Sequence, residues 1–87
     1  MQPRVSIIIP VYNGEKYIRN SIIKLQKQTY TNLEVIYVDD GSTDQTGIIL
    51  DETATEDDRF WVIHKENGGV SAARNTGIKA ATGEYLI

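Results

Sequence analysis

The feature that most constrains the fold is the regular alternation of short apolar runs with longer segments that carry helical signals. Residues 5–9, 33–38 and 60–63 form runs rich in β-branched and aromatic residues, as expected of strands buried on both faces of a sheet. Helical segments of about 10 to 15 residues between strands indicate right-handed βαβ units and a parallel sheet. We therefore predict an α/β fold, a Rossmann-like three-layer α/β/α arrangement with a mostly parallel sheet.

The first two helical segments carry N-terminal signals. Pro10 is expected to end the first strand, and Asn13 to cap a helix that starts at Gly14. The apolar face of that helix comprises Ile18, Ile22 and Leu25. Ser42 and Gln45 fit a capping box, with Ser42 at the N-cap and Gln45 at the third helical position.

The last part of the chain predicts one more helix and the beginning of another strand. Small residues dominate the segment from about 70 to 81, and they permit close packing of a helix against the sheet. Gly83 stands where a left-handed C-terminal cap is expected. Residues 84–87 are interpreted as the opening of a fourth strand.

Length and composition exclude several functional classes. A chain of 87 residues with 40% hydrophobic residues is globular and makes one small domain at most. The net charge is −3 with scattered Lys and Arg, which argues against a nucleic-acid partner, and the absence of cysteine excludes disulfides and thiolate metal sites. The apolar run near the start is too short for a signal peptide or a membrane span. We expect a soluble, cytoplasmic protein.

The unusual residues collect where a parallel α/β sheet binds ligands, in the crevice at the carboxyl ends of its strands. These places are residues 10–13, 39–41 and 64–69. Asp39 and Asp40 follow an apolar strand, and their side chains point to opposite faces unless the backbone turns at Gly41. A carboxylate here can accept hydrogen bonds from a nucleobase or ribose, or help to hold a metal. The alternative is that one aspartate caps the next helix and the other is solvated.

Two residues after the first strand are further candidates. Tyr12 offers a flat face on which a base can stack, a contact worth about 1–3 kcal/mol; the alternative is an ordinary tyrosine at the edge of the core. Glu15 lies in the first turn of the predicted helix. It either complements the helix dipole or reaches back to the same ligand.

The glycine-rich turn before the third predicted helix is a third candidate. Gly68 and Gly69 allow backbone amides to approach a diphosphate at a helix N-terminus. Arg74 lies about one turn into that helix and requires a carboxylate or phosphate partner. A salt bridge to Asp39, Asp40 or Glu15 and a direct ligand contact are both open. His64 is assigned no catalytic role.

Taken together, these segments resemble family 2 of the glycosyltransferases, which have the GT-A fold, over essentially the whole chain. The matching stretches are 5–13 (VSIIIPVYN), 28–30 (QTY), 34–44 (EVIYVDDGSTD), 67–77 (NGGVSAARNTG) and 83–85 (GEY). Each stretch is weak alone, but the set is specific in this order and spacing. The resemblance implies the N-terminal half of a GT-A fold, that is, the nucleotide-binding part of an inverting glycosyltransferase.

The resemblance also implies roles for individual residues in binding a nucleotide diphosphate sugar, expected to be a UDP-sugar. The ring of Tyr12 packs on the base and Asp40 bonds it, while the backbone of Pro10 and Val11 holds the ribose. Residues that support the pocket or lie near the diphosphate are Glu15, Asp39, Gly68 and Arg74. The acceptor is expected to be a glycan or a lipid-linked molecule, in polysaccharide biosynthesis for example, at the inner face of a membrane.

One expected motif is missing from these residues. The family holds Mg²⁺ or Mn²⁺ with an Asp-x-Asp motif to neutralise the leaving diphosphate, and a later carboxylate deprotonates the acceptor. That motif is expected a few residues beyond Ile87, and no Asp or Glu follows Glu84. We therefore expect residues 1–87 to be a nucleotide-binding part truncated before the motif, with no catalytic residue and no metal ligand, and to be inactive alone.

Other functional classes fit less well. A non-catalytic nucleotide-binding or interaction module stays open as the alternative. A phosphoryl-accepting receiver places its acid pair after the first strand, whereas here the pair follows the second. A haloacid-type phosphatase needs Asp-x-Asp-Gly-Thr where residues 38–42 read VDDGS. A dinucleotide oxidoreductase needs Gly-x-Gly-x-x-Gly after the first strand, where residues 10–14 read PVYNG.

Overall fold

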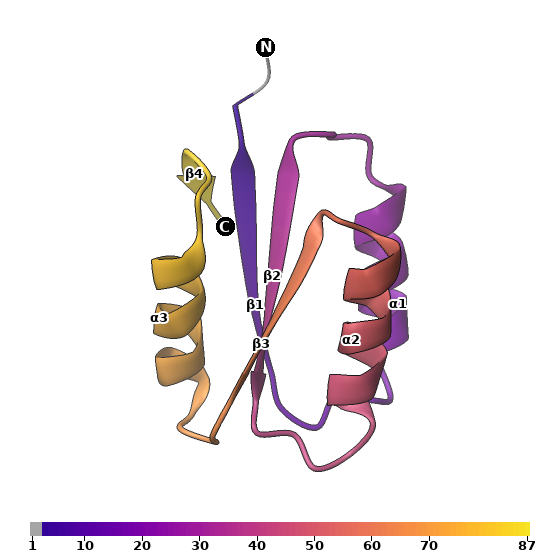
Figure 1. Cartoon of the computed structure of the whole chain (residues 1–87), viewed down its shortest axis with the longest axis vertical. Coiled ribbons are helices and arrows are strands. Elements are labelled where there is room, and N and C mark those ends of the chain that lie inside the picture. The colour runs from indigo at the N-terminus through magenta and orange to yellow at the C-terminus, as the bar shows by residue number, and fades with distance from the viewer. Residues whose placement is uncertain (1–2) are drawn as a thin grey trace.

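The computed structural model describes residues 3–87, which form a three-layer α/β/α structure with strands and helices in strict alternation (Figure 1). The elements are β1 (Val5–Val11), α1 (Ile18–Lys27), β2 (Leu33–Asp40), α2 (Thr46–Glu56), β3 (Phe60–Lys65), α3 (Val70–Ala80) and β4 (Tyr85–Leu86). The strands are parallel and lie in the order β3-β2-β1-β4. Helices α1 and α2 cover one face and α3 the other. This confirms the predicted fold class.

Strand β2 lies at the centre of the core because neighbours flank it on both edges and helices lie on both faces. All eight of its residues are buried. Val35 and Tyr37 belong to the larger core, with residues of α1 and α2, whereas Ile36 and Val38 pack with Ala73 of α3. Successive side chains of a strand point to opposite faces. A strand buried on both faces must therefore be apolar at nearly every position.

Tyr37 is the largest side chain that is fully buried. Its ring stacks against Phe60 of β3, with 6.2 Å between the ring centroids. Its hydroxyl lies 2.8 Å from the Ser21 hydroxyl of α1. One side chain thus joins β2 to β3 and to the helix layer.

The strands run further than the apolar runs alone predicted. β1 continues through Pro10 to Val11, β2 ends at Asp40 and β3 ends at Lys65. The ladder also pairs Val11 with Asp39, and Asp40 with Lys65. Polar side chains at the strand ends therefore lie within the sheet rather than in the loops after it.

The predicted cap at Asn13 is wrong. Helix α1 begins at Ile18, and a turn with a hydrogen bond from Tyr17 N–H to Gly14 O precedes it. Asn13 has a left-handed backbone (φ 49°), and its side-chain oxygen accepts the Thr43 N–H at 2.8 Å. Asn13 therefore joins the loop after β1 to the loop after β2, and its side chain is not available to cap a helix.

The predicted capping box at Ser42 and Gln45 is also wrong. Helix α2 begins at Thr46, and its N-cap residue Gln45 makes no side-chain cap bond. The Ser42 hydroxyl instead accepts the Asn13 N–H at 2.9 Å. Asp44 supplies the local acceptor, since its Oδ1 lies 2.9 Å from Thr46 N.

The third prediction that fails concerns Gly83. Helix α3 ends at Ala80, its C-cap is Ala81, and Gly83 is not among the described glycines with positive φ. A Cβ at Gly83 would lie 2.5 Å from Ser6 Oγ and 2.8 Å from Ser6 N. Glycine is therefore needed there for close approach to β1, not for a left-handed cap.

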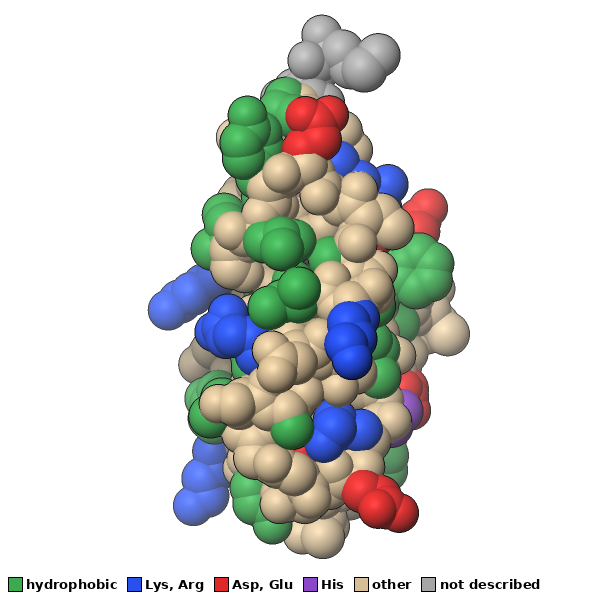
Figure 2. Space-filling view, turned by 90° about the vertical axis from the view of Figure 1, so that its left-hand side faces the viewer, with side chains coloured by type: hydrophobic (Ala, Val, Ile, Leu, Met, Phe, Trp, Pro, Cys, Tyr) green, Lys and Arg blue, Asp and Glu red, His purple; other side chains and the backbone are tan. Residues whose placement is uncertain are grey.

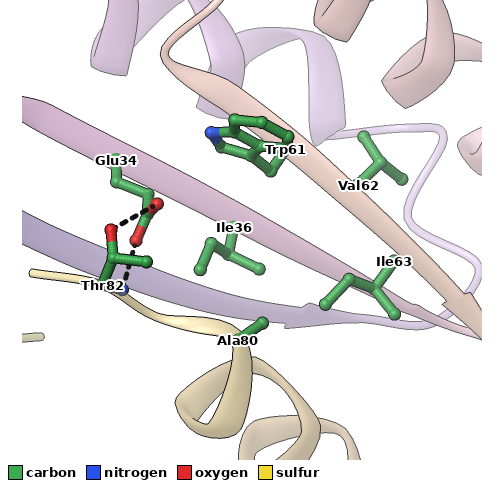
Figure 3. Close-up of a pocket in the computed structure, with 7 residues that line it drawn as sticks. All are labelled: Glu34, Ile36, Trp61, Val62, Ile63, Ala80 and Thr82. Atoms are coloured by element: carbon green, nitrogen blue, oxygen red, sulfur yellow. Dashed lines mark hydrogen bonds between the residues drawn. The ribbon is translucent and has the colours of Figure 1, made fainter.

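A shallow, mainly apolar pocket lies on the α3 face of β2 and β3, beside the end of α3 (Figure 3). The residues that line it are Glu34, Ile36, Trp61, Val62, Ile63, Ala80 and Thr82. The Glu34 carboxylate, the one charged group there, already accepts hydrogen bonds from Ser6, Arg4 and Thr82. The carboxylate of this pocket therefore has no free acceptor position for a nucleotide.

Two further observations bear on the expected partners. Figure 2 shows the face that carries α3, where Lys and Arg side chains are spread out and form no single basic patch. Within residues 3–87, no helix is long and apolar enough to cross a bilayer.

Candidate functional site

The candidate site lies at the carboxyl ends of the strands, where the loops after β1, β2 and β3 meet at the lower end of Figure 1. A small pocket there is lined by Pro10, Val11, Tyr12, Asp40 and Val70. The structure thus brings four of the eight predicted site residues together. Val70, the first residue of α3, was not predicted.

Asp40 is the charged group of this pocket, and its side chain is only 5% exposed. Its Oδ1 accepts hydrogen bonds from Lys65 Nζ at 3.0 Å and from the Gly68 amide at 2.9 Å. Its Oδ2 accepts the Gly69 amide at 2.9 Å. The Gly68 amide, and after it the Lys65 ammonium, hold the pKa of the Asp40 carboxyl below its usual value. Asp40 is therefore an ionised group that can only accept hydrogen bonds.

The hydrogen bonds of Asp40 leave it little capacity for a ligand. A carboxylate has about four acceptor positions, and three are occupied by Lys65, Gly68 and Gly69. The fourth position is on Oδ2. A ligand in the pocket would therefore meet Asp40 through one hydrogen-bond donor.

Tyr12 and Val70 supply apolar surface beside this carboxylate. Tyr12 is 50% exposed and Val70 is 68% exposed, although both line the same pocket. Large apolar side chains beside one oriented polar group suit a flat ligand with an apolar face and a polar edge. A nucleobase has this shape.

Asp39 points to the opposite face of the sheet and does not line the pocket. Its Oδ2 lies 2.9 Å from His64 Nδ1, and its Oδ1 accepts the Ser42 N–H at 3.0 Å. The two aspartates therefore have separate partners, as expected for neighbours on a strand without a turn between them. Asp39 therefore holds the loop after β2, through Ser42, and contacts β3 through His64.

His64 joins this side of the sheet to α2. Its Nε2 lies 2.7 Å from Asp51 Oδ1, and its Nδ1 faces Asp39. Asp51 first, and then Asp39, raise the pKa of His64 above its usual 6.5. The imidazolium form is therefore favoured by folding.

Stability is expected to depend on pH through His64. Because its folded-state pKa is raised above 6.5, its contribution is fully present below about pH 6.5 and is lost as pH rises through the folded-state value. Urea unfolding at about pH 5.5 and about pH 8.5 measures this, with His64→Gln as the control. The difference between wild type and variant should shrink at the higher pH. An equal difference at both pH values would contradict it.

Glu15 and Arg74 lie outside the pocket lining. Glu15 is exposed, and its backbone N–H contacts Asp44 Oδ2 at 3.3 Å. Arg74 is exposed on α3 and forms no ion pair with any carboxylate in the described part of the chain. Of the two alternatives left open for Arg74, the salt bridge to Asp39, Asp40 or Glu15 is therefore not formed. The guanidinium group of Arg74 is free to meet an anion.

The amides of Gly68 and Gly69 were predicted to approach a diphosphate, but here both donate to Asp40. Gly69 has φ 95°, a conformation that favours glycine. Gly68 is therefore connected to the site through the carboxylate of Asp40. In this structure neither amide is available to a phosphate group.

Sequence reasoning missed Lys65 and Val70. Lys65 pairs with Asp40 in the β2–β3 register, so it could have been found only by aligning the ends of the two strands. Val70 follows Gly69 directly, and its exposed position in the pocket depends on where α3 begins. From the sequence alone, a valine at position 70 indicated only an apolar residue of the predicted helix.

Comparison with known proteins places the chain in a family. The model described as Glycosyl transferase family 2 matches residues 6–87. The chain belongs to glycosyl transferase family 2. It is 51% identical over 86 residues to the uncharacterized glycosyltransferase EpsJ of Bacillus subtilis (strain 168), a match that covers 99% of this chain and 25% of that protein.

Two similar solved structures agree with this family assignment. The mannosyltransferase PcManGT from Pyrobaculum calidifontis, in complex with GDP-Man and Mn²⁺, is 32% identical with a TM-score of 0.89, over 99% of this chain and 26% of that one. S. aureus TarS 1–349 in complex with UDP-GlcNAc is 38% identical with a TM-score of 0.88, over 97% and 25%. This glycosyl transferase family 2 chain thus spans about a quarter of the length of these three relatives.

A metal ion was expected to be held by residues outside this chain. Within residues 3–87, no group of three or more His, Asp or Glu side chains is arranged to hold a metal ion. The residues described here therefore do not fit a catalytic metal centre by themselves. The Mn²⁺ named with PcManGT belongs to a chain about four times as long.

Proposed function

We propose that residues 1–87 are the nucleotide-binding part of an inverting glycosyltransferase that transfers a sugar from a nucleotide diphosphate sugar, a UDP-sugar in the first instance. The observation that carries the proposal is the pocket in which the buried, ionised Asp40 lies beside the exposed ring of Tyr12. The family assignment and the similarity to glycosyltransferases solved with nucleotide sugars support it.

The pocket suggests how the base is recognised. The base stacks on Tyr12 and contacts Val70, while the backbone at Pro10 and Val11 holds the ribose. The free position on Asp40 Oδ2 accepts an N–H from the base edge. Uracil and guanine both present a ring N–H on their Watson–Crick edge, and UDP-GlcNAc and GDP-Man are the ligands in the two similar structures. Cytosine and adenine present an acceptor nitrogen there, which the carboxylate repels.

Other predicted residues take supporting roles in this proposal. Arg74, with no carboxylate partner in the described structure, provides a cation for the diphosphate. Gly68 and Asp39 hold the loops around the pocket, and Glu15 lies at the turn before α1. The Mg²⁺ or Mn²⁺ ion that would neutralise the leaving diphosphate requires ligands beyond Ile87, as does the base that deprotonates the acceptor. We assign no catalytic role to the present residues.

The partners of the whole protein follow from the same proposal. The donor is a nucleotide diphosphate sugar and the acceptor is a glycan or a lipid-linked molecule, in polysaccharide biosynthesis for example. We place the protein in the cytoplasm, at the inner face of a membrane that carries the acceptor. An assay of sugar transfer by a longer version of the protein distinguishes the two candidate functions. Transfer supports the glycosyltransferase, whereas nucleotide binding without transfer supports a non-catalytic module.

Calorimetric titration of nucleotides into the folded chain tests the proposal. UDP, GDP and dTDP are compared with CDP and ADP, each with and without Mn²⁺, after circular dichroism has established that the chain is folded. We expect binding of a nucleotide whose base has a ring N–H (uracil, thymine or guanine), little dependence on metal, and loss of binding in Tyr12→Ala and Asp40→Ala. A folded chain that binds none of these nucleotides would contradict the proposed pocket.

A further inference from the structure

Lys65 is a charged side chain next to the proposed base pocket that the proposed function does not use. It is the last residue of β3, directly beside Asp40 in the parallel register. Its ammonium group donates to Asp40 Oδ1 at 3.0 Å and to the backbone oxygen of Glu66 at 2.6 Å. Its side chain is 22% exposed. Lys65 is therefore held at the carboxylate rather than extended into solvent.

The contact restricts which oxygen of Asp40 can meet a ligand. Lys65 and the Gly68 amide both donate to Oδ1, whereas Oδ2 receives only the Gly69 amide. With two acceptor positions on each oxygen, Oδ1 is fully occupied and Oδ2 has one position left. Without Lys65, Oδ1 would regain a free position.

We propose that Lys65 is a positioning residue for base recognition, which occupies Asp40 Oδ1 so that a single acceptor on Oδ2 faces the base. The proposal rests on the proposed function, because it assumes that Asp40 contacts a nucleobase. Its consequence is selectivity. One fixed acceptor suits the imide N–H of uracil, whereas a second free position on Oδ1 would also accept the exocyclic amino group of cytosine.

Lys65 also affects the charge state of Asp40. Its ammonium group is the second of the groups that lower the pKa of the Asp40 carboxyl, after the Gly68 amide. Removing it should raise that pKa, so UDP binding should be lost at a higher pH when the solution is acidified. A residue that only fixes the loop between β3 and α3 would not shift this midpoint.

The test compares Lys65→Met with wild type by calorimetric titration of UDP and CDP over a range of pH. Lys65→Arg keeps the positive charge and is expected to restore most of the binding. Lys79→Met is the matched control, since Lys79 is exposed in the last turn of α3 and makes none of these contacts. Circular dichroism shows whether each variant is folded.

We expect Lys65→Met to bind UDP about tenfold more weakly, because the Asp40 carboxylate loses a hydrogen bond that fixes its position, and one hydrogen bond to a charged group is worth about this much. The ratio of UDP to CDP affinity should fall, and the acid midpoint of UDP binding should rise. Lys79→Met should match wild type.

Three outcomes would overturn the inference in distinguishable ways. If wild type binds UDP and Lys65→Met has the same affinity, base preference and midpoint, only the role of Lys65 is wrong. Equal weakening of UDP and CDP with an unchanged midpoint means that Lys65 is merely structural. If folded wild type binds no nucleotide, the proposed function fails, and the role of Lys65 with it.

Discussion

Asparagine in place of Asp40 is expected to weaken UDP binding by about a hundredfold. This is the size expected when a charge-assisted hydrogen bond to the ligand is lost and the hydrogen bonds around the residue are also disturbed. Asp40 is surrounded by three donors, Lys65 Nζ and the amides of Gly68 and Gly69. An asparagine amide has one acceptor oxygen, and its NH₂ group would face at least one of these donors. The negative charge is lost, and the turn at Gly68 and Gly69 loses a hydrogen bond to residue 40.

Asp39→Asn provides the matched control, because it makes the same chemical change one residue away. Asp39 contacts His64 and Ser42 on the other face of the sheet. We therefore expect Asp39→Asn to lower stability but to leave UDP binding within about threefold of wild type, less than one hydrogen bond is worth. Calorimetric titration of both folded variants measures the difference. Equal loss of binding in the two variants would contradict the assignment of the base contact to Asp40 alone.

Alanine in place of Tyr37 is expected to cost about 3–5 kcal/mol of the free energy of unfolding, as for other large buried aromatic residues. Tyr37 is fully buried and stacks on Phe60, so truncation leaves a cavity between β2, β3 and α1. Small domains have little stability to spare, since about 5–15 kcal/mol is typical of whole proteins. If the stability of this small domain lies at the lower end of that range, Tyr37→Ala has a measurable unfolded population at 37 °C.

Tyr37→Phe separates packing from hydrogen bonding. It removes only the hydroxyl that lies 2.8 Å from the Ser21 hydroxyl, for an expected loss of about 1 kcal/mol. Urea unfolding followed by far-ultraviolet circular dichroism gives both values. If Tyr37→Ala unfolds with nearly the same free energy as Tyr37→Phe, the ring is not the packing centre described here.

The fold could be predicted from the sequence because its strongest signals do not depend on distant contacts. The run at 33–38 is apolar at every position except Glu34, which only a strand buried on both faces requires. The parallel order then follows from the helices between strands. The failed predictions at Asn13 and Ser42 concern side chains that bond each other's loops across 29 or 30 residues. Local pattern carries no information about such pairing.

The candidate site was predictable in part for the same reason. Tyr12 and Asp40 could be placed at one edge because each follows a predicted strand. The contacts of Asp40 with Lys65, Gly68 and Gly69 span 25 to 29 residues, and they depend on the strand register and on the path of the glycine turn. Gly83 was misinterpreted because its close approach to Ser6 joins residues 77 apart.

The central place of β1 has a consequence for how the chain is synthesised. β1 is synthesised well before β4, yet one of its edges pairs with β4: Ile8 N–H donates to Ile87 O, and Ile87 N–H donates to Ser6 O. A growing chain can close the other edge as soon as β2 has left the ribosome. The edge of β1 facing β4 stays without a strand partner until residue 87 has emerged. During translation this strand is thus open to pairing with other chains.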